Sequence, residues 1–329
     1  MTTLTSATAA APSPAPNSQP PASRRRHVLD LDDFGRDEIA EILETTAGMK
    51  EVLGRSIKQV PALRGKTVVN MFFEDSTRTR ISFELAAKAL SANVVSMTGK
   101  GSSVEKGESL IDTVRTLQAL GADMIVIRHG ESGAPYLVAE HFRGSVLNAG
   151  DGRHAHPTQA LLDLFTINEK LGRIEGLKVV IVGDILHSRV ARSNLWALTT
   201  MGARVTLCAP NTLLGPAAYW TATWPGLTIT TDLDECVAGA DVLMTLRLQK
   251  ERQESGLLPS LREYSRFFGL TAERVKRAAP HCLVMHPGPM NEGVEIMPDV
   301  ATSAQSVIEE QVTNGVAVRM ALMYRLASE

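Results

Sequence analysis

Cysteine is scarce in this sequence. The three cysteines, Cys208, Cys236 and Cys282, are widely spaced and lie in apolar contexts. A disulfide framework or a cysteine metal cluster would need more cysteines at closer spacing. We therefore expect buried, reduced thiols and a reducing compartment such as the cytoplasm.

Long apolar runs and an excess of basic residues are also missing. No stretch approaches the roughly 20 apolar residues that a membrane helix needs, so we expect no membrane span. Lys and Arg number 34 against 36 Asp and Glu, for a formal net charge of −2, whereas nucleic-acid-binding proteins usually show a basic balance. An anion site here requires a local concentration of positive charge, which favours a small anionic ligand and no nucleic acid.

Residues 1–27 lack acidic side chains and are rich in Ala, Pro, Ser and Thr. Such a segment cannot bury enough apolar surface to fold, so a disordered tail is predicted. It has no continuous apolar core like that of a secretory signal. Its acid-poor composition and its arginines nevertheless leave an organelle transit peptide as an alternative.

The rest of the chain alternates short apolar runs with helical stretches. Short β-branched and apolar runs are typical of buried parallel strands, and their alternation with helices indicates a sheet covered on both faces. The runs are 67–73, 93–97, 123–128, 145–150, 178–184, 204–210, 241–247 and 282–288. This number of strands in 329 residues suggests an α/β protein of two domains, each a parallel sheet flanked by helices.

Long helices are predicted to join these domains. Segment 156–172 has the pattern of one long helix, with Pro157 in its first turn and Gly172 as its stop. The apolar residues of about 305–329 recur at helical spacing and predict a helix that packs back on the first domain. We therefore place the first domain at 28–170 and the second at 171–329.

The segment 73–80, FEDSTRTR, follows the first apolar run and precedes a helix. Ser76 or Thr77 can cap that helix, whose free N–H groups and positive dipole end favour an anion. A guanidinium adds bidentate contacts to phosphate oxygens. Together these groups predict a phosphate site.

The two arginines of this segment are predicted to serve different purposes. Residues two apart on a helix point about 200° apart, so Arg78 and Arg80 cannot face one ligand. Arg80 precedes Glu84 by four residues, which is the spacing of an ion pair on one helix face. We expect Arg78 to bind the ligand and Arg80 to stabilise the helix.

Further polar residues follow later strands, where ligands of open α/β sheets bind. Arg128 ends one strand, and His156 and Gln159 lie at the helix start after the next, so one ligand could contact all three. The loop with Ser102 and Lys106 fits either a solvated connector or a mobile lid. From the residues alone, the connector is favoured.

In the second half, three more segments follow strands. Arg189 lies near a helix start and is placed to bind a carboxylate, while the turn before it lacks GxGxxG, which argues against a dinucleotide-binding dehydrogenase. Arg247 and Gln249 belong to a charged run that could equally be a solvated surface. Pro287 and Pro289 stiffen the HPGP segment and leave backbone carbonyls open to donors such as an amide NH₂.

In order and spacing, FEDSTRTR, SSVEKGES, HPTQ, RLQKER and HPGP closely resemble motifs of the transcarbamylase family, and of its aspartate-specific members in particular. The resemblance extends from about residue 28 to the C-terminus. It implies transfer of the carbamoyl group of carbamoyl phosphate to L-aspartate, an early step of pyrimidine (UMP) biosynthesis. It also implies that no metal and no cofactor take part.

The resemblance assigns residues to each substrate. Those implied for carbamoyl phosphate are Ser76, Thr77, Arg78, Thr79, Arg128, His156, Gln159 and the carbonyls of Gly288 and Pro289. Those implied for aspartate are Lys106, Arg189, Arg247 and Gln249. Ser102 and Lys106 would reach into the active site of a neighbouring subunit of a homotrimer, which replaces the connector interpretation. Regulatory chains or another pyrimidine enzyme are further partners that the resemblance allows.

The implied chemistry is direct attack of the aspartate amine on the carbamoyl carbon. Thr79, Arg128 and His156 would stabilise the carbonyl oxygen as it gains charge. Arg78 and Lys106 would offset the charge on the departing phosphate.

Two other functions remain as alternatives. Ornithine carbamoyltransferases share STRTR and HPTQ, but they have HCLP where this chain has Pro287 after His286. A non-catalytic relative acting as an assembly partner would not require the intact set of arginines and histidine.

One departure from the family is Glu292, where relatives often carry a basic residue, and it adds negative charge near the anion site.

Overall fold

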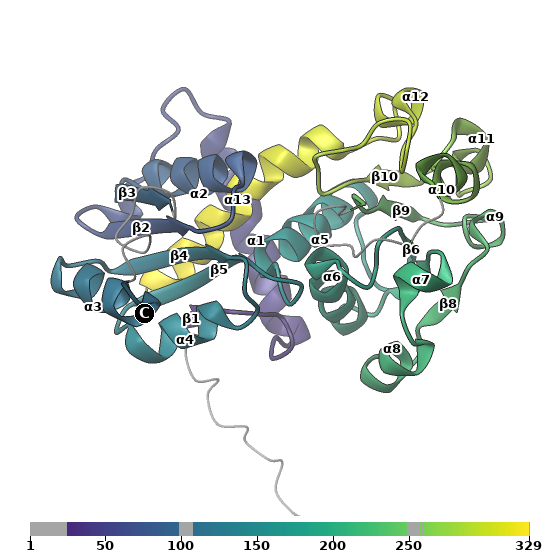
Figure 1. The fold of residues 1–329 in the computed structure, drawn as a ribbon. Helices are drawn as coiled ribbons and strands as arrows, with labels where there is room; N and C mark the ends of the chain where they lie inside the picture. The colour runs from purple at the N-terminus through teal and green to yellow at the C-terminus, as the bar shows by residue number, and fades with distance from the viewer. Residues whose placement is uncertain (1–24, 99–107, 249–256, 258–259, 329) are drawn as a thin grey trace, which may run out of the picture.

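The computed structural model describes residues 25–98, 108–248, 257 and 260–328. In this part of the chain, two sheets of parallel strands lie side by side and are flanked by helices (Figure 1). The α/β fold with two parallel sheets is therefore confirmed.

The strands follow the predicted pattern closely. The first sheet has the order β1-β5-β4-β2-β3, with β1 (His27–Val28), β2 (Thr67–Phe72), β3 (Asn93–Thr98), β4 (Met124–His129) and β5 (Ser145–Asp151). The second has the order β10-β9-β6-β7-β8, with β6 (Lys178–Val182), β7 (Arg204–Cys208), β8 (Thr228–Thr230), β9 (Val242–Thr245) and β10 (Leu283–Met285). All of the predicted strands are present. The prediction missed β1 and β8 because two and three residues are too short for a recognisable pattern.

Helices cover both sheets and connect them. Around the first sheet lie α1 (Arg36–Leu53), α2 (Thr77–Ala89), α3 (Leu110–Ala119) and α4 (Ala134–His141), with a 3₁₀ turn at Pro61–Leu63. Around the second lie α6 (Arg189–Thr200), α7 (Asn211–Leu214), α8 (Ala217–Thr223), α9 (Leu233–Cys236), α10 (Leu261–Phe268), α11 (Ala272–Val275) and α12 (Pro298–Ala301). The remaining helices, α5 (Pro157–Leu171) and α13 (Ile308–Ala327), contact elements of both halves.

The strand β2 shows why a buried parallel strand is apolar throughout. Val69 and Met71 belong to a core that also contains residues of α3 and α4. Val68 and Phe72 belong to the larger core that contains residues of α1, α2 and α13. Since successive strand residues face opposite sides, both faces of this sheet are buried.

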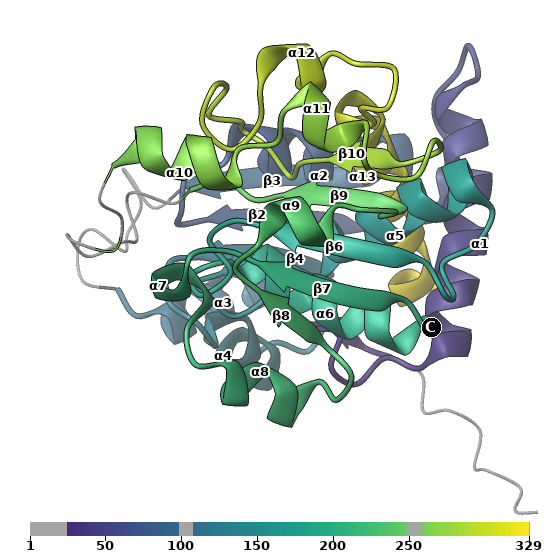
Figure 2. The same ribbon diagram turned by 90° about the vertical axis from the view of Figure 1, so that its right-hand side faces the viewer.

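The connection between the halves is made by α5 and α13. The helix α5 begins at Pro157 and ends before Gly172, whose φ of 70° is a left-handed cap, so the predicted helix is confirmed. It contacts α1 on one side and α6 on the other. The helix α13, yellow in Figure 1, packs against α1, α2 and α5. Figure 2 looks onto the second sheet, with β6, β7, β8 and β9 towards the viewer.

The last residues of the predicted tail are part of the fold. Arg25 pairs with Asp33 and Glu38, its guanidinium lies 3.6 Å from the centre of the Phe34 ring, and His27 starts β1. The predicted tail boundary at residue 27 is therefore wrong, since ion pairs and a strand fix the chain from Arg25 onward.

The three cysteines are buried and free, as expected from their spacing. Among the residues that the structure describes, no helix combines the length and the apolar composition needed to cross a membrane.

Two helical glycines differ in the space around them. An added Cβ at Gly315, in α13, would lie 2.6 Å from Arg319 Nη1 and 3.1 Å from a methyl carbon of Leu162. At Gly48, in α1, the residue is exposed and no atom lies within 4 Å of such a Cβ. The first glycine therefore permits close packing, whereas the second only weakens its helix.

We expect Gly315→Ala to lower the free energy of unfolding by about 1–3 kcal/mol, because overpacking displaces the buried arginine. Gly48→Ala, the matched control, should raise it by about 0.5–1 kcal/mol, because alanine favours a helix. Urea denaturation followed by circular dichroism measures both changes. A Gly315→Ala variant as stable as the parent would contradict the tight packing of α13.

Candidate active site

A pocket of about 850 Å³ lies where the carboxyl ends of strands from both sheets meet. The polar residues that follow β2, β4, β5, β6, β9 and β10 reach it because parallel strands present their carboxyl ends at one edge. Every predicted site residue that the structure describes lines it, namely Ser76, Thr77, Arg78, Thr79, Arg128, His156, Gln159, Arg189, Arg247, Gly288 and Pro289. Ser102, Lys106 and Gln249 lie outside the described residues.

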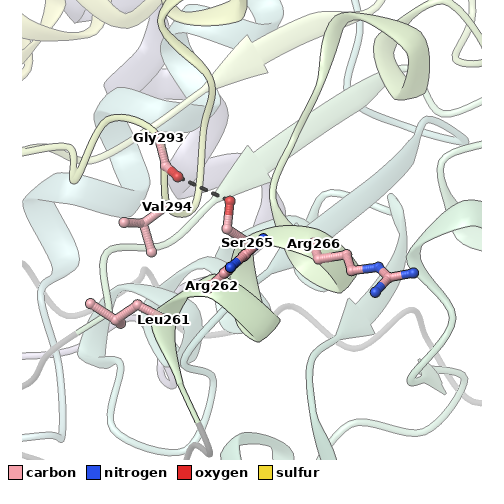
Figure 3. Close-up of a pocket in the computed structure, with 6 residues that line it drawn as sticks. All are labelled: Leu261, Arg262, Ser265, Arg266, Gly293 and Val294. Atoms are coloured by element: carbon pink, nitrogen blue, oxygen red, sulfur yellow. Dashed lines mark hydrogen bonds between the residues drawn. The ribbon is translucent and has the colours of Figure 1, made fainter.

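A second hollow, of about 630 Å³, lies against α10 (Figure 3). Its lining residues are Leu261, Arg262, Ser265, Arg266, Gly293 and Val294. Ser265 Oγ donates to the carbonyl of Gly293 at 2.9 Å, and the Arg266 side chain extends away from this contact (Figure 3). None of the predicted site residues lines it, so we assign it no chemistry.

The turn between β2 and α2 forms one wall of the main pocket. Ser76 is the N-cap of α2, and its hydroxyl makes no capping bond. The first helical bond is donated by Arg80 N to Ser76 O at 3.1 Å, so the N–H groups of residues 77–79 lie outside the helical pattern. Hydroxyls and free N–H groups therefore meet at the positive end of a helix dipole, as predicted for an anion site.

The two arginines of this turn do separate by direction. Arg78 lines the pocket and Arg80 does not. The predicted ion pair between Arg80 and Glu84 is wrong, because Glu84 instead accepts from Lys88 Nζ at 2.6 Å. Glu84 has a basic residue four positions away on either side, and a glutamate placed before its lysine is the better arrangement with the helix dipole. Among the described residues, Arg80 forms no ion pair.

Gly288 allows the second half of the chain to close over Arg78. Its φ is 63°, and an added Cβ would lie 2.7 Å from Arg78 Cζ. Only glycine combines this backbone conformation with so close an approach. Burial, and then repulsion from Arg247, lower the pKa of Arg78. An anion bound between these two arginines would relieve that repulsion.

Glu74 is a pocket residue that the sequence analysis missed. Its Oε1 accepts from Arg128 Nη2 and Arg189 Nη2, each at 2.6 Å, and its Oε2 accepts from Arg189 Nη1 at 3.1 Å. At Gly150, an added Cβ would lie 2.9 Å from Arg189 Cζ and 3.1 Å from Arg128 Nη1. Glu74 thus holds arginines from both halves side by side. Its position directly after a strand was the available signal.

His156 and Gln159 are held at the start of α5. His156 N donates to Ser193 Oγ on α6 at 2.8 Å, and its side chain is buried. Gln159 Nε2 donates to Asp163 Oδ1 at 3.0 Å. These contacts fix both residues against the wall formed by α5 and α6.

The loop after β10 is held by a buried histidine and glutamate. His286 Nδ1 accepts from Gly288 N at 2.7 Å, so its Nε2 donates to Glu295 Oε1 at 3.3 Å. Glu295 also accepts from Asn291 N at 2.6 Å. Burial lowers the pKa of His286, which keeps it neutral near pH 7. Glu292 is exposed and does not line the pocket, so its carboxylate is not part of the site.

Arg319 is a second missed pocket residue. It reaches the pocket from α13, where Nη1 donates to Ser82 Oγ at 2.7 Å and Cζ lies 4.8 Å from the centre of the Phe83 ring. Burial lowers the pKa of Arg319 to about 10, so the side chain is still charged at neutral pH. The helical pattern of this segment predicted only core packing, which hid this residue.

The charges of the pocket are strongly unequal. Its described lining contains the guanidinium groups of Arg78, Arg128, Arg189, Arg247 and Arg319. The acidic side chains in the same lining are Glu74 and Asp75. No group of His, Cys, Asp and Glu suited to hold a metal ion occurs in the described part of the chain. The arrangement can therefore bind small molecules that carry several negative charges.

Comparison with known families gives two matches that together span nearly the whole chain. The model described as "Aspartate/ornithine carbamoyltransferase, carbamoyl-P binding domain" matches residues 26–169. The model described as "Aspartate/ornithine carbamoyltransferase, Asp/Orn binding domain" matches residues 175–326.

Individual relatives agree with these matches. The aspartate carbamoyltransferase catalytic subunit of Roseiflexus sp. (strain RS-1) is 82% identical over 306 residues, which cover 93% of this chain and 96% of the relative. That of Chloroflexus aurantiacus (strain J-10-fl) is 74% identical over 303 residues, which cover 92% and 98%.

Solved structures are similar over the same length. The catalytic subunit of aspartate transcarbamoylase from M. jannaschii is 36% identical with a TM-score of 0.82, covering 92% of this chain and 98% of that one. The Trypanosoma cruzi enzyme in complex with carbamoyl phosphate and aspartate is 30% identical with a TM-score of 0.83, covering 91% and 96%.

The positive pocket leads to a prediction about stability. Inorganic phosphate should raise the melting temperature, because a ligand at about 100 times its Kd adds about 2.7 kcal/mol to the free energy of unfolding. Differential scanning calorimetry at increasing phosphate concentration measures the effect. Potassium chloride at matched ionic strength is the control, and an equal shift with chloride would contradict a specific site.

Proposed function

Because the chain belongs to the aspartate/ornithine carbamoyltransferase family and transfers the carbamoyl group of carbamoyl phosphate to L-aspartate, we propose that the pocket between its two sheets holds both substrates. One observation carries this proposal. The predicted site residues in the described chain all line this pocket, where guanidinium groups from both halves converge. Two anionic substrates need such a place if they are to react with each other.

Carbamoyl phosphate would bind at the start of α2. The hydroxyls and N–H groups of residues 76–79 surround the phosphate, and the Arg78 guanidinium contacts its oxygens. The carbamoyl oxygen then faces Arg128 and His156. The carbamoyl NH₂ faces the amide oxygen of Gln159 and the carbonyls of Gly288 and Pro289. The shared lining of these groups supports this arrangement.

L-Aspartate would bind on the side of the second sheet. Arg189 and Arg247 contact its carboxylates. Gln249 and Lys106 are the other aspartate-binding residues that the family resemblance implies. Glu74 orients Arg189 through two hydrogen bonds, which supports a fixed direction for that guanidinium. The amine of the bound aspartate is then directed at the carbamoyl carbon.

The reaction needs positioning and charge stabilisation. As the amine attacks, the new C–N bond forms, and the carbonyl oxygen gains negative charge that Thr79, Arg128 and His156 stabilise. The bond to the phosphate oxygen then breaks, and Arg78 and Lys106 offset the charge on the departing phosphate, which accepts the amine proton. Holding two anions in contact replaces an unfavourable encounter in water with a fixed geometry.

We also propose that the active sites are shared within a homotrimer. On α2, Ile81 and Leu85 are 45% and 51% exposed one helical turn apart, and Val95 on the edge strand β3 is 50% exposed. Exposed apolar residues beside a sheet edge are typical of a protein interface. This surface directly precedes the segment with Ser102 and Lys106, which the resemblance places in a neighbour's site.

We propose that the reaction is a step of pyrimidine biosynthesis, which its product, N-carbamoyl-L-aspartate, supports. We propose a cytoplasmic location, which the three buried, free cysteines support. Regulatory chains or another pyrimidine enzyme would be further partners of the trimer.

Arg78→Ala should lower kcat/KM for carbamoyl phosphate at least about 100-fold, because it removes a charged donor that acts on the leaving group. Arg80→Ala is the matched control and should stay within about threefold of the parent, because Arg80 does not line the pocket. Formation of carbamoyl aspartate measures both. L-Ornithine as acceptor should give no comparable rate, and a preference for ornithine would overturn the assigned reaction.

Shared sites predict complementation between inactive variants. Arg78→Ala and Lys106→Ala trimers, dissociated, mixed and reassociated, should regain activity, because some hybrid sites take Arg78 and Lys106 from two intact chains. Analytical ultracentrifugation establishes the mass, and each variant treated alone is the control. Hybrids that stay inactive while trimers form would exclude a shared site.

A further inference from the structure

Asp163 lies in α5, one helical turn beyond Gln159, and its side chain is completely buried. It accepts hydrogen bonds from three side-chain amides on three helices. Gln159 Nε2 and Gln311 Nε2 donate to Oδ1 at 3.0 and 2.8 Å, and Asn194 Nδ2 donates to Oδ2 at 2.8 Å. Asp163 does not line the pocket, whereas Gln159 and Gln311 do.

The carboxylate determines which way these amides face. An ionised carboxylate can only accept, so each amide turns its NH₂ towards Asp163 and its oxygen away. For Gln159, the oxygen is then the group available to the pocket. For Gln311, the oxygen accepts from His286 N at 3.0 Å, at the start of the loop that carries Gly288 and Pro289. One carboxylate thus supports two walls of the same subsite. One wall presents the amide oxygen of Gln159, and the other is the loop with the carbonyls of Gly288 and Pro289.

We propose that Asp163 is a positioning residue that makes this subsite accept hydrogen bonds, so that it selects a carbamoyl group over an acetyl group of similar size. A carbamoyl NH₂ donates two hydrogen bonds, and an acetyl methyl group donates none. Buried acceptors left without a donor disfavour the wrong ligand. The inference rests on the proposed site for carbamoyl phosphate and concerns how that site discriminates.

The surroundings of Asp163 keep it ionised at neutral pH. Burial raises its pKa to about 6, while the three amide donors and the nearby charge of Arg319 act in the opposite direction. Arg319 lies on α13, as does Gln311, so the helix that closes the first domain also supports this carboxylate.

Two substitutions distinguish the role of Asp163 as a hydrogen-bond acceptor from its role in folding. Asp163→Leu leaves Gln159 and Gln311 without their interior acceptor. Asp163→Asn keeps an oxygen at the Oδ1 position, which serves both glutamines, and turns its NH₂ to Asn194. The Asn194 amide, which now turns Nδ2 towards Asp163, must rotate so that its Oδ1 accepts from this NH₂, and the hydrogen bond from Asn194 Nδ2 to Val190 O is then lost.

The experiment measures Kd by calorimetry for carbamoyl phosphate, acetyl phosphate and inorganic phosphate. The parent should prefer carbamoyl over acetyl phosphate. Asp163→Leu should lower this preference at least about tenfold, while the Kd for inorganic phosphate stays within about threefold, because residues 76–79 bind phosphate. Asp163→Asn should retain the preference within about threefold.

Asn194→Ala is the matched control. It removes the donor to Asp163 Oδ2, but Asn194 does not line the pocket, so it should lower the melting temperature and leave the preference unchanged. A purely structural Asp163 would make Asp163→Leu behave in the same way, and that result would overturn the inference.

The outcomes distinguish this inference from the proposed function. A parent protein that shows no preference for carbamoyl phosphate would contradict the proposed site itself. A parent that prefers it, with the preference intact in folded Asp163→Leu, would contradict only the role of Asp163. If Asp163→Leu does not fold, Gln311→Met decides, since it cuts the connection to His286. A preference at least about threefold lower supports the inference, and an unchanged one overturns it.

Discussion

The pairing of Glu74 with two arginines is the interaction on which the pocket depends. Two parallel sheets that meet at their carboxyl ends bring Arg128 and Arg189 to one place, where like charges in a partly buried space would repel. The carboxylate between them, with hydrogen bonds of 2.6 Å to each, makes this concentration of positive charge compatible with a folded chain. The same carboxylate therefore supports the anion-binding character of the site and adds one contact between the halves.

Glycines and buried hydrogen bonds also shape the pocket, in addition to its charges. Gly150 and Gly288 allow guanidinium groups to lie directly against the backbone, closer than any side chain would permit. Elsewhere, the buried carboxylate of Asp163 and the neutral His286 each orient their neighbours through donors and acceptors of fixed sense. The pocket thus combines charged side chains held by ion pairs with a frame whose hydrogen-bonding direction is set from the interior.

Features that depend on local sequence pattern could be predicted, and features that depend on contacts between residues far apart in the chain could not. The strands and α5 follow from periodicity and from Pro157 and Gly172. Most site residues follow from the rule that ligands bind beyond strand ends. Glu84 had two possible partners at equal spacing, and the prediction left out the preference for a glutamate placed before its base, which favours Lys88 over Arg80. Arg319 reaches the pocket from a segment far along the chain, so no local signal marked it.

The position of α13 has a consequence for synthesis of the protein. This helix is the last element of the chain, yet it packs against α1 and α2, which are among the first. Its buried residues include Met320, Leu322 and Met323 in the core that covers one face of the first sheet. The first domain therefore leaves the ribosome with an apolar face uncovered until α13 emerges. During that interval, the exposed apolar face makes the nascent chain prone to aggregation.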